Sequence, residues 1–255
     1  MKAHELATWP TLIFERRLWV SSDRLKLKAT IPLYTIHDLG RMLNIPVSTL
    51  GQWIHGDSES TGDVLVTHMP VKRGSRQPSI PFIGLAEAFV LAAFRRAGVP
   101  MQRIRPALTV LAQTIGLEHA LASRRLFTDG AEILYDMSQQ SHVGSVLREG
   151  IQHLVIVRNG QQVFRDIVAE YLHCITWDSD GYPEVIRLPA YSRADVIVDM
   201  TRAFGQPIVQ QHAIRVQDIL DRFVAGEDLH TIAEDYGLAQ DVVEEIVRVA
   251  SRWAS

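Results

Sequence analysis

Residues 34–56 read YTIHDLGRMLNIPVSTLGQWIHG, and this pattern predicts two short helices joined by a tight turn. Thr35 and Asp38 have the residue types and the spacing of a capping box, which satisfies free N–H groups at the start of a helix. Pro46 disfavours helical geometry at the residue before it, so the first helix is expected to end there. Gly56 follows the second predicted helix, and glycine readily adopts the left-handed conformation that ends helices. The stretch therefore predicts a helix-turn-helix.

The second predicted helix presents short or neutral hydrogen-bonding side chains on its outer face. Ser48, Thr49 and Gln52 lie on this face and suit DNA phosphates and base edges in a major groove. Arg41, in the first predicted helix, adds a cation to the same candidate set. The alternative is a helical hairpin that only contributes to a core, since helix-turn-helix patterns also occur by chance. We predict that this unit binds DNA.

A basic segment follows the predicted helix-turn-helix. The apolar runs Val64–Val66 and Ile80–Ile83 predict two strands, and the loop between them contains Lys72, Arg73 and Arg76. A basic hairpin directly after a recognition helix is typical of a wing, which holds phosphates beside the groove that the helix enters. The alternative is a solvated loop. We predict that the three cations contact DNA.

Two further patterns flank this unit. Arg24, Lys26 and Lys28 alternate with apolar residues, which predicts a strand whose basic face is either a solvated edge or a DNA contact. Residues 84–97 are apolar nearly all round and predict a buried helix with a basic C-terminal end. The helix expected next carries an apolar stripe over Met101–Leu111, which belongs either to the core or to a dimer seam.

The first part of the chain resembles the winged-helix DNA-binding domain of MerR-type regulators. The resemblance rests on residues 34–56, on the basic loop and on FIGLAEAFVLAAFRRAGVPMQRIRPAL at 82–108. It covers residues 34–111 and implies a DNA-binding domain over residues 1–115. Gly51 stands where that family usually has Arg, and the cysteines of its metal sensors are absent. One recognition helix reads only a few base pairs, so a homodimer is expected.

The centre of the chain, residues 116–192, is predicted to be β-rich. Three hairpins are expected, within 123–134 around Asp-Gly, within 153–164 around Asn-Gly, and within 171–188 around the DSDG turn. The acidic DSDG turn suggests calcium, but it lacks the distal Glu and the other ligands of a calcium loop. The centre therefore predicts strands and no metal site.

The last part of the chain predicts a second helix-turn-helix shape of opposite charge. Helices are expected at 216–224, 228–236 and 240–253. Residues 215–255 contain four Lys and Arg against nine Asp and Glu, a net charge of −5, whereas residues 24–106 contain eleven against five, a net charge of +6. An acidic surface repels phosphate, so this end predicts a protein partner. The candidate partner-binding residues are Arg202, Phe204, Gln206, Asp241, Glu244 and Glu245.

This end resembles a small helical domain of bacterial antitoxins that are encoded beside PIN-like ribonuclease toxins of the VapC sort. The resemblance rests on FGQPIV and on VQDILDRFVAGEDLHTIAEDYGLAQDVVEEIVRVAS, and it covers residues 196–250. With the MerR-like front, the chain resembles the longer VapB-type antitoxins. The resemblance implies a mainly α (α+β) fold with domains at 1–115, 116–192 and 193–255. It also implies operator DNA and a PIN-like toxin as partners, neutralisation of that toxin, and repression of the chain's own operon.

The sequence contains no recognisable catalytic or metal-binding constellation. The ten His residues are scattered, no HExxH, GxSxG or phosphate-cradling glycine loop is present, and Cys174 stands alone. We therefore expect no enzyme activity, no cofactor and no metal. No signal peptide and no apolar run of about 20 residues is found, so a cytoplasmic protein is expected. The alternative function is a free-standing MerR-like transcriptional regulator whose central region binds a small molecule.

Overall fold

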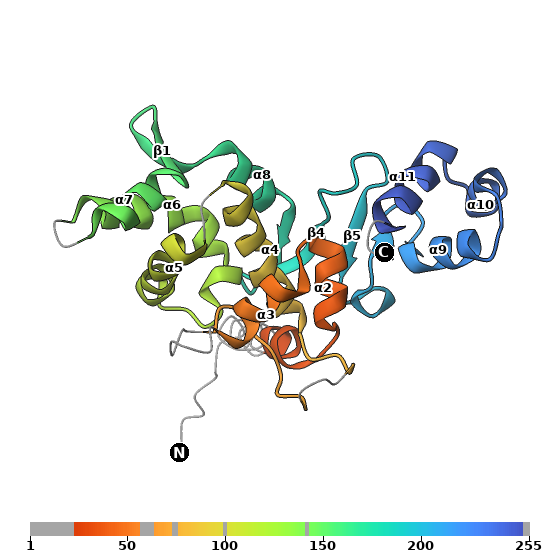
Figure 1. Ribbon diagram of the computed structural model, residues 1–255, viewed down its shortest axis with the longest axis horizontal. Helices are drawn as coiled ribbons and strands as arrows, with labels where there is room; N and C mark the ends of the chain where they lie inside the picture. Colours follow the sequence, from red (N-terminus) through yellow and green to blue (C-terminus); the bar gives the residue numbers. More distant parts are fainter. Residues whose placement is uncertain (1–22, 57–63, 73–75, 99–100, 141–142, 252–255) are drawn as a thin grey trace, which may run out of the picture.

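The computed structural model describes residues 23–56, 64–72, 76–98, 101–140 and 143–251. The fold is mainly α (α+β), as predicted, with helices around two small antiparallel sheets (Figure 1). Figure 1 places α5 to α7 at one end, the helix-turn-helix in the middle and α9 to α11 at the other end. Within the described ranges, no helix combines the length and the apolar character needed to cross a membrane.

Helices α2 (Ile36–Leu43) and α3 (Val47–His55) form the predicted helix-turn-helix. The capping box is confirmed, because Thr35 Oγ1 accepts from the Asp38 N–H at 3.1 Å and the Asp38 carboxylate accepts from the Thr35 N–H at 2.9 Å. Asn44, with φ of +56°, ends α2 in the left-handed conformation. These local signals fix where α2 begins and ends. Helix α3 ends at the predicted Gly56, but with φ of +73° and ψ of +176° this glycine is not in the expected left-handed helical conformation.

Helix α4 (Phe82–Arg96) lies at the centre of the core, and its residues from Phe82 to Phe94 are all buried. Helix α5 (Met101–Ile115) follows, and its Leu108 and Leu111 are buried in the core of this chain. At least these two members of the apolar stripe are therefore core residues. The short helix η1 (Ala120–Ala122) and helix α7 (Ser145–Gln152) complete this end of the molecule.

The predicted hairpin at 123–134 is wrong, because these residues begin the helix α6 (Arg124–Gln139). Ser123 caps this helix by accepting from the Leu126 N–H. The Asp-Gly pair that suggested a turn lies within the helix instead. A Cβ at Gly130 would lie 3.1 Å from the Phe164 ring, which is a tight contact, so glycine suits the close approach of this ring. Tertiary packing thus explains a glycine that the sequence pattern assigned to a turn.

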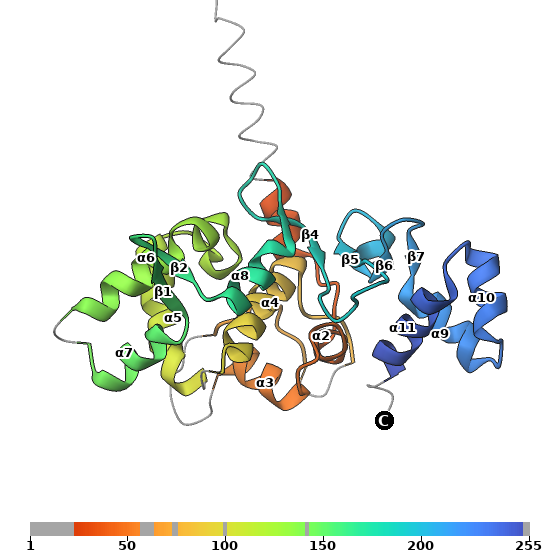
Figure 2. The same ribbon diagram turned by 90° about the horizontal axis from the view of Figure 1, so that it is seen from above.

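The predicted strand over residues 24–28 is also wrong, because residues 23–30 are helical. Lys28 is only 4% exposed, and its Nζ donates to Asp178 at 3.0 Å and to Asp180 at 2.8 Å. Arg24 pairs with Asp178 as well. Figure 2 shows this helix beside the turn between β3 and β4, on the side opposite α2 and α3. The basic residues therefore anchor a helix to a distant turn.

The hairpin predicted within 153–164 is confirmed as β1 (Val155–Arg158) and β2 (Gln161–Phe164). Helix α8 (Asp166–His173) follows. The hairpin around DSDG is confirmed too, as the first two strands of a five-stranded sheet. The strands of this sheet, in order, are β3 (Ile175–Trp177), β4 (Pro183–Arg187), β5 (Val196–Asp199), β6 (Ile208–Val209) and β7 (Ile214–Arg215). The sheet runs through the predicted boundary at 192/193.

The three predicted C-terminal helices are present as α9 (Val216–Val224), α10 (Leu229–Tyr236) and α11 (Gln240–Ala250). Asp228 caps α10, and Gly237 ends it with φ of +62°. Buried Ile219, Ile232 and Ile246 join the three helices in one small core. The short helix η2 (Ala203–Gly205) lies in the loop between β5 and β6.

Candidate nucleic-acid interface and partner surface

The outer face of α3 is open to solvent. Leu50 and Trp53 are buried and fix the helix against the core, whereas Ser48 and Gln52 are exposed and Thr49 is half-buried. Arg41 of α2 is exposed and pairs with Asp38 at 3.2 Å. Of the four predicted side chains on these two helices, Arg41, Ser48 and Gln52 are therefore exposed and Thr49 is partly so.

Two arginines outside the predicted set of DNA-binding residues also contact α3. Arg95 donates from Nη1 to Thr49 Oγ1 at 2.9 Å, and Arg105 donates from Nη2 to the backbone carbonyl of Gln52 at 3.2 Å. They lie in the RRAGVPMQRIR stretch that carried the MerR resemblance. Because the Thr49 hydroxyl is neutral, its bond with Arg95 leaves positive charge next to the candidate recognition helix.

The predicted wing is present as a loop rather than as a hairpin of two strands. Val64–Val66 forms no strand, and Phe82 already begins α4. Ile80 makes an isolated bridge with Tyr34, and the Met69 N–H donates to the Ser79 carbonyl at 2.6 Å. Strand pairing is replaced by helix contacts, since Leu65 and Val66 are buried and the Leu65 N–H bonds the Trp53 carbonyl. Lys72 and Arg76 are exposed, and Arg73 lies outside the described residues.

A buried polar cluster holds this loop against the core. Glu87, within the otherwise apolar α4, accepts from the Thr67 N–H at 2.6 Å and lies 3.3 Å from His119 Nδ1. The same ring nitrogen lies 2.9 Å from Thr67 Oγ1. Burial opposes charge on His119, but the hydrogen bond to Glu87 and the charges of Glu87 and Glu118 outweigh it and raise the pKa of His119. The cluster fixes one side of the basic loop.

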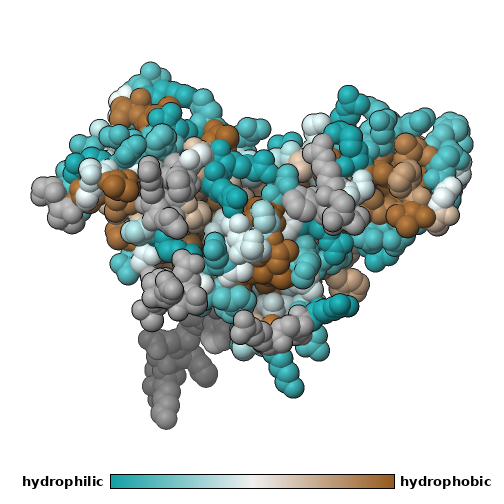
Figure 3. Space-filling view, in the orientation of Figure 1, coloured by the Kyte–Doolittle hydropathy of each residue, from teal (hydrophilic) through white to brown (hydrophobic). Residues whose placement is uncertain are grey.

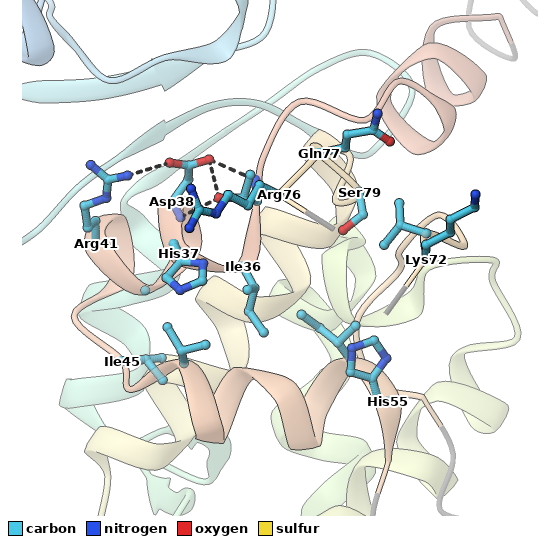
Figure 4. Close-up of a pocket in the computed structure, with 15 residues that line it drawn as sticks. Ile36, His37, Asp38, Arg41, Ile45, His55, Lys72, Arg76, Gln77 and Ser79 are labelled. Atoms are coloured by element: carbon cyan, nitrogen blue, oxygen red, sulfur yellow. Dashed lines mark hydrogen bonds and ion pairs between the residues drawn. The ribbon is translucent and has the colours of Figure 1, made fainter. Parts of the chain in front are cut away.

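A groove of about 1190 Å³ lies between α2, α3 and the basic loop (Figure 4). Its floor is apolar and includes Ile36 and Ile54. Its rim includes His55, Lys72 and Arg76. Lys72 and Arg76 of the basic loop therefore line the same groove as His55 of α3, and Asp38, which also lines it, is paired with Arg41.

The candidate partner residue Phe204 is displayed at the tip of a strained loop. Its side chain is 87% exposed, and φ is +48° at Ala203, +53° at Phe204 and +73° at Gly205. Left-handed geometry is unfavourable for non-glycine residues, so the surroundings must hold it. The Asp199 carboxylate accepts from the Thr201 N–H at 2.8 Å within this loop. Arg202 and Gln206, at its two sides, are half-buried.

The acidic face of α11 differs from the prediction at one position. Asp241 and Glu244 are exposed, but Glu245 is only 3% exposed and does not lie on the outer surface. Its carboxylate accepts backbone N–H bonds from residues 192–194, at 2.7 to 3.0 Å. Burial alone would raise the pKa of Glu245, but these bonds and the Ser192 hydroxyl lower it. Glu245 therefore fixes a loop, and placing it on a partner-binding face was wrong.

Within the described part of the chain, no group of three or more His, Cys, Asp or Glu side chains is placed to hold a metal ion. The carboxylates of the DSDG turn bond to Lys28 and Arg24 instead. Cys174 is buried, and burial raises the pKa of its thiol. The DSDG carboxylates and Cys174 therefore have structural roles, in ion pairs and in the core.

Residues 32–108 match the family model described as "Putative DNA-binding HTH domain", and residues 196–248 match "Protein of unknown function (DUF433)". Among curated proteins, the chain is 41% identical over 230 residues to "Putative antitoxin VapB45" of Mycobacterium tuberculosis, covering 88% of this chain and 95% of that protein. It is 24% identical over 228 residues to "Uncharacterized protein Rv2308" of the same organism, covering 87% and 91%.

A crystal structure titled as Rv2018 from Mycobacterium tuberculosis is similar, with a TM-score of 0.76 and 40% identity over 87% of this chain and 99% of that one. The two family models match the helix-turn-helix and the C-terminal helices separately. An exposed recognition helix, a matching helix-turn-helix model and a relative that aligns over nearly its whole length agree with one another. The chain belongs to the family of VapB-type antitoxins and contains a helix-turn-helix DNA-binding domain.

Proposed function

We propose that this chain is a DNA-binding antitoxin that neutralises a PIN-like, VapC-type ribonuclease and represses its own operon. The observation that supports it best is the exposed face of α3, where Ser48 and Gln52 are open to solvent and Arg95 adds positive charge. Neutral polar side chains suit base edges, and cations beside them suit phosphates. The relative named as an antitoxin supports the same role.

In this proposal the two ends of the chain have different partners. Ser48, Thr49 and Gln52 enter the major groove of operator DNA, while Arg41 and the cations of the basic loop, Lys72, Arg73 and Arg76, hold phosphates. A homodimer would place two recognition helices on a palindromic site. The toxin is held by the strained loop with Arg202, Phe204 and Gln206 and by the exposed acids Asp241 and Glu244, in a cytoplasmic complex. The chain itself catalyses nothing in this scheme.

Co-expression with the neighbouring gene tests the proposal. The chain and a ribonuclease encoded beside it should co-purify, and the ribonuclease should be inactive in the complex. The complex should also shift a duplex taken from upstream of the operon more strongly than an unrelated duplex. An active ribonuclease that elutes apart from the chain would refute the antitoxin role, and equal shifts of both duplexes would refute autorepression.

A further inference from the structure

An apolar cleft of about 430 Å³ separates α2 from the C-terminal helices. One wall belongs to the helix-turn-helix, through Arg41 and Met42, and the opposite wall is α9. Gln206 and Pro207 also line the cleft, so it begins two residues from the exposed Phe204. The cleft is therefore continuous with the loop that we assign to the toxin.

Helix α9 presents an uncovered apolar stripe to this cleft. Val216, Leu220, Phe223 and Val224 are spaced at helical intervals and all line it. Val216 is buried at one end, whereas Phe223 is 39% and Val224 83% exposed at the other. Figure 3 shows apolar side chains gathered over this end of the molecule. Because leaving apolar area in water costs about 25 cal/mol per Å², the stripe favours a partner that covers it.

The mouth of the cleft has a small negative charge, because Asp38 and Asp221 line it together with one cation, Arg41. Asp221 lines it, and its carboxylate accepts a hydrogen bond from the neutral amide of Gln217 at 2.7 Å. Asp38 lines it too, and Arg41 beside it is already paired with Asp38. A partner with Lys or Arg next to an apolar face complements this mouth.

We propose that this cleft docks a helix of the toxin through an apolar stripe flanked by Lys or Arg. The identity of the partner rests on the proposed function. The walls are formed mainly by the side chains of α2, α9 and the end of α11, and they offer no long strand edge to which a partner strand could be added. A groove of this kind binds the apolar face of an amphipathic helix.

The docked helix contacts the DNA-binding unit as well as the C-terminal helices. Asp38 and Arg41 line both this cleft and the groove beside α3. Toxin binding should therefore protect backbone amides in both α2 and α9 from hydrogen exchange. A toxin held only by the acidic face of α11 would leave α2 unprotected, so the two docking modes give different exchange patterns.

Calorimetric titration of the full-length chain with the neighbouring ribonuclease tests the docking site. We compare the wild type with Phe223→Ala/Val224→Asp, with Asp221→Asn, and with Val146→Asp as a control. Val146 is a 56% exposed valine on helix α7, which lies at the opposite end of the molecule from α9 in Figure 1. Val146→Asp therefore makes the same change of side chain as Val224→Asp at a distant site. The cleft variant should weaken the Kd at least tenfold, which corresponds to about 1.4 kcal/mol. Asp221→Asn should reduce the dependence of the Kd on salt concentration, and Val146→Asp should bind with the wild-type Kd.

Far-ultraviolet circular dichroism melts confirm that the variants are folded. Wild-type affinity in the folded cleft variant would overturn the docking site and leave the antitoxin proposal intact. A concentration-dependent dimer of the chain alone that the cleft variant abolishes would assign the cleft to a second copy and overturn the inference. No binding by the wild type would overturn the toxin proposal and this inference together.

Discussion

The phenol of Tyr34 donates a hydrogen bond to the backbone carbonyl of Gly205 at 2.9 Å, across 171 positions of the chain. Tyr34 stands directly before Thr35, the N-cap of α2, and its backbone exchanges hydrogen bonds with Ile80 at the base of the basic loop. Burial raises the pKa of Tyr34 far above its ordinary value, so the hydroxyl stays a donor at neutral pH. One side chain thus joins the helix-turn-helix to the loop that displays Phe204.

Tyr34→Phe removes this donor and leaves the Gly205 carbonyl without it. A buried carbonyl that loses its partner costs about 1–3 kcal/mol, so the free energy of unfolding should fall by that amount. Urea unfolding measures the loss, and affinity for the toxin should fall as the loop loosens. An unchanged unfolding free energy would show that water replaces the hydroxyl and that the contact does not hold the loop.

Gly205→Ala should be more damaging than the loss of the hydroxyl. A Cβ at Gly205 would meet Tyr34 Oη at 2.6 Å, and φ there is +73°. Gly98 provides a matched control, since its φ is +84° but an added Cβ meets nothing within 4 Å. Left-handed geometry alone costs an L-residue about 1–2 kcal/mol, which is the loss expected for Gly98→Ala in urea unfolding. Equal losses in both variants would show that the close approach of Tyr34 is unimportant.

Local sequence signals predicted the elements that depend on local geometry. The capping box of Thr35 and Asp38, the Asn159-Gly160 turn and the stop at Gly237 each act within a few residues of the chain. The signals failed where contacts with distant residues determine the local conformation. Lys28 alternates with apolar neighbours as in a strand, but its carboxylate partner Asp178 lies 150 positions away. No pattern around residue 28 could reveal that contact.

In the candidate interface, too, the local features were predictable and the long-range contacts were not. Helical spacing was enough to predict that Ser48 and Gln52 share an exposed face. The contacts of Arg95 and Arg105 with α3 depend on how α4 and α5 pack, which sequence spacing does not give. Glu245 looked like part of an acidic surface because it neighbours Glu244. A loop 51 to 53 positions away buries it by donating three backbone N–H groups to its carboxylate.

Lys28→Met should be strongly destabilising. It would leave the carboxylates of Asp178 and Asp180, which are 8% and 2% exposed, without their buried cation. Removing one partner of a buried pair costs about 3–5 kcal/mol, measurable by urea unfolding. Arg24→Ala, at the exposed side of the same cluster, is the control and should have a small effect. Equal effects would show that burial of Lys28 does not strengthen the pair.

The same cluster predicts an acid dependence. Burial alone would raise the pKa of Asp178, but hydrogen bonds from Lys28, the Ser179 backbone and Arg24 outweigh it and lower the pKa. A carboxyl with a lowered folded pKa stabilises the protein above its unfolded pKa of about 3.9, and this stabilisation is lost as pH falls further. The difference in unfolding free energy between wild type and Lys28→Met should therefore shrink below about pH 4.

His119 predicts a dependence near neutral pH of the opposite sign. Its pKa is raised in the folded state, so its stabilisation is fully present below the unfolded value of about 6.5. It is lost as pH rises through the folded pKa. His119→Asn keeps a residue that tolerates the φ of +54° and removes the titration. Urea unfolding between pH 6 and pH 8.5 should show a smaller decline in the variant.

The control for His119 is His230→Asn, because His230 lies on α10 with 67% of its side chain exposed. It should keep the wild-type decline. If His119→Asn keeps that decline as well, the charged pair with Glu87 does not contribute to stability.

Neutralising the basic loop should change how DNA binding depends on salt. Replacing Lys72, Arg73 and Arg76 together by Ala should weaken binding to operator and unrelated duplexes alike, because each phosphate that the variant cannot neutralise keeps its counterions. The slope of log K against log salt should fall by about 0.9 for each such phosphate. Gln52→Ala should instead reduce the preference for the operator and leave the slope unchanged, since a neutral side chain releases no counterion. Fluorescence anisotropy at several salt concentrations separates the two effects, and an unchanged slope in the triple variant would remove the basic loop from the DNA interface.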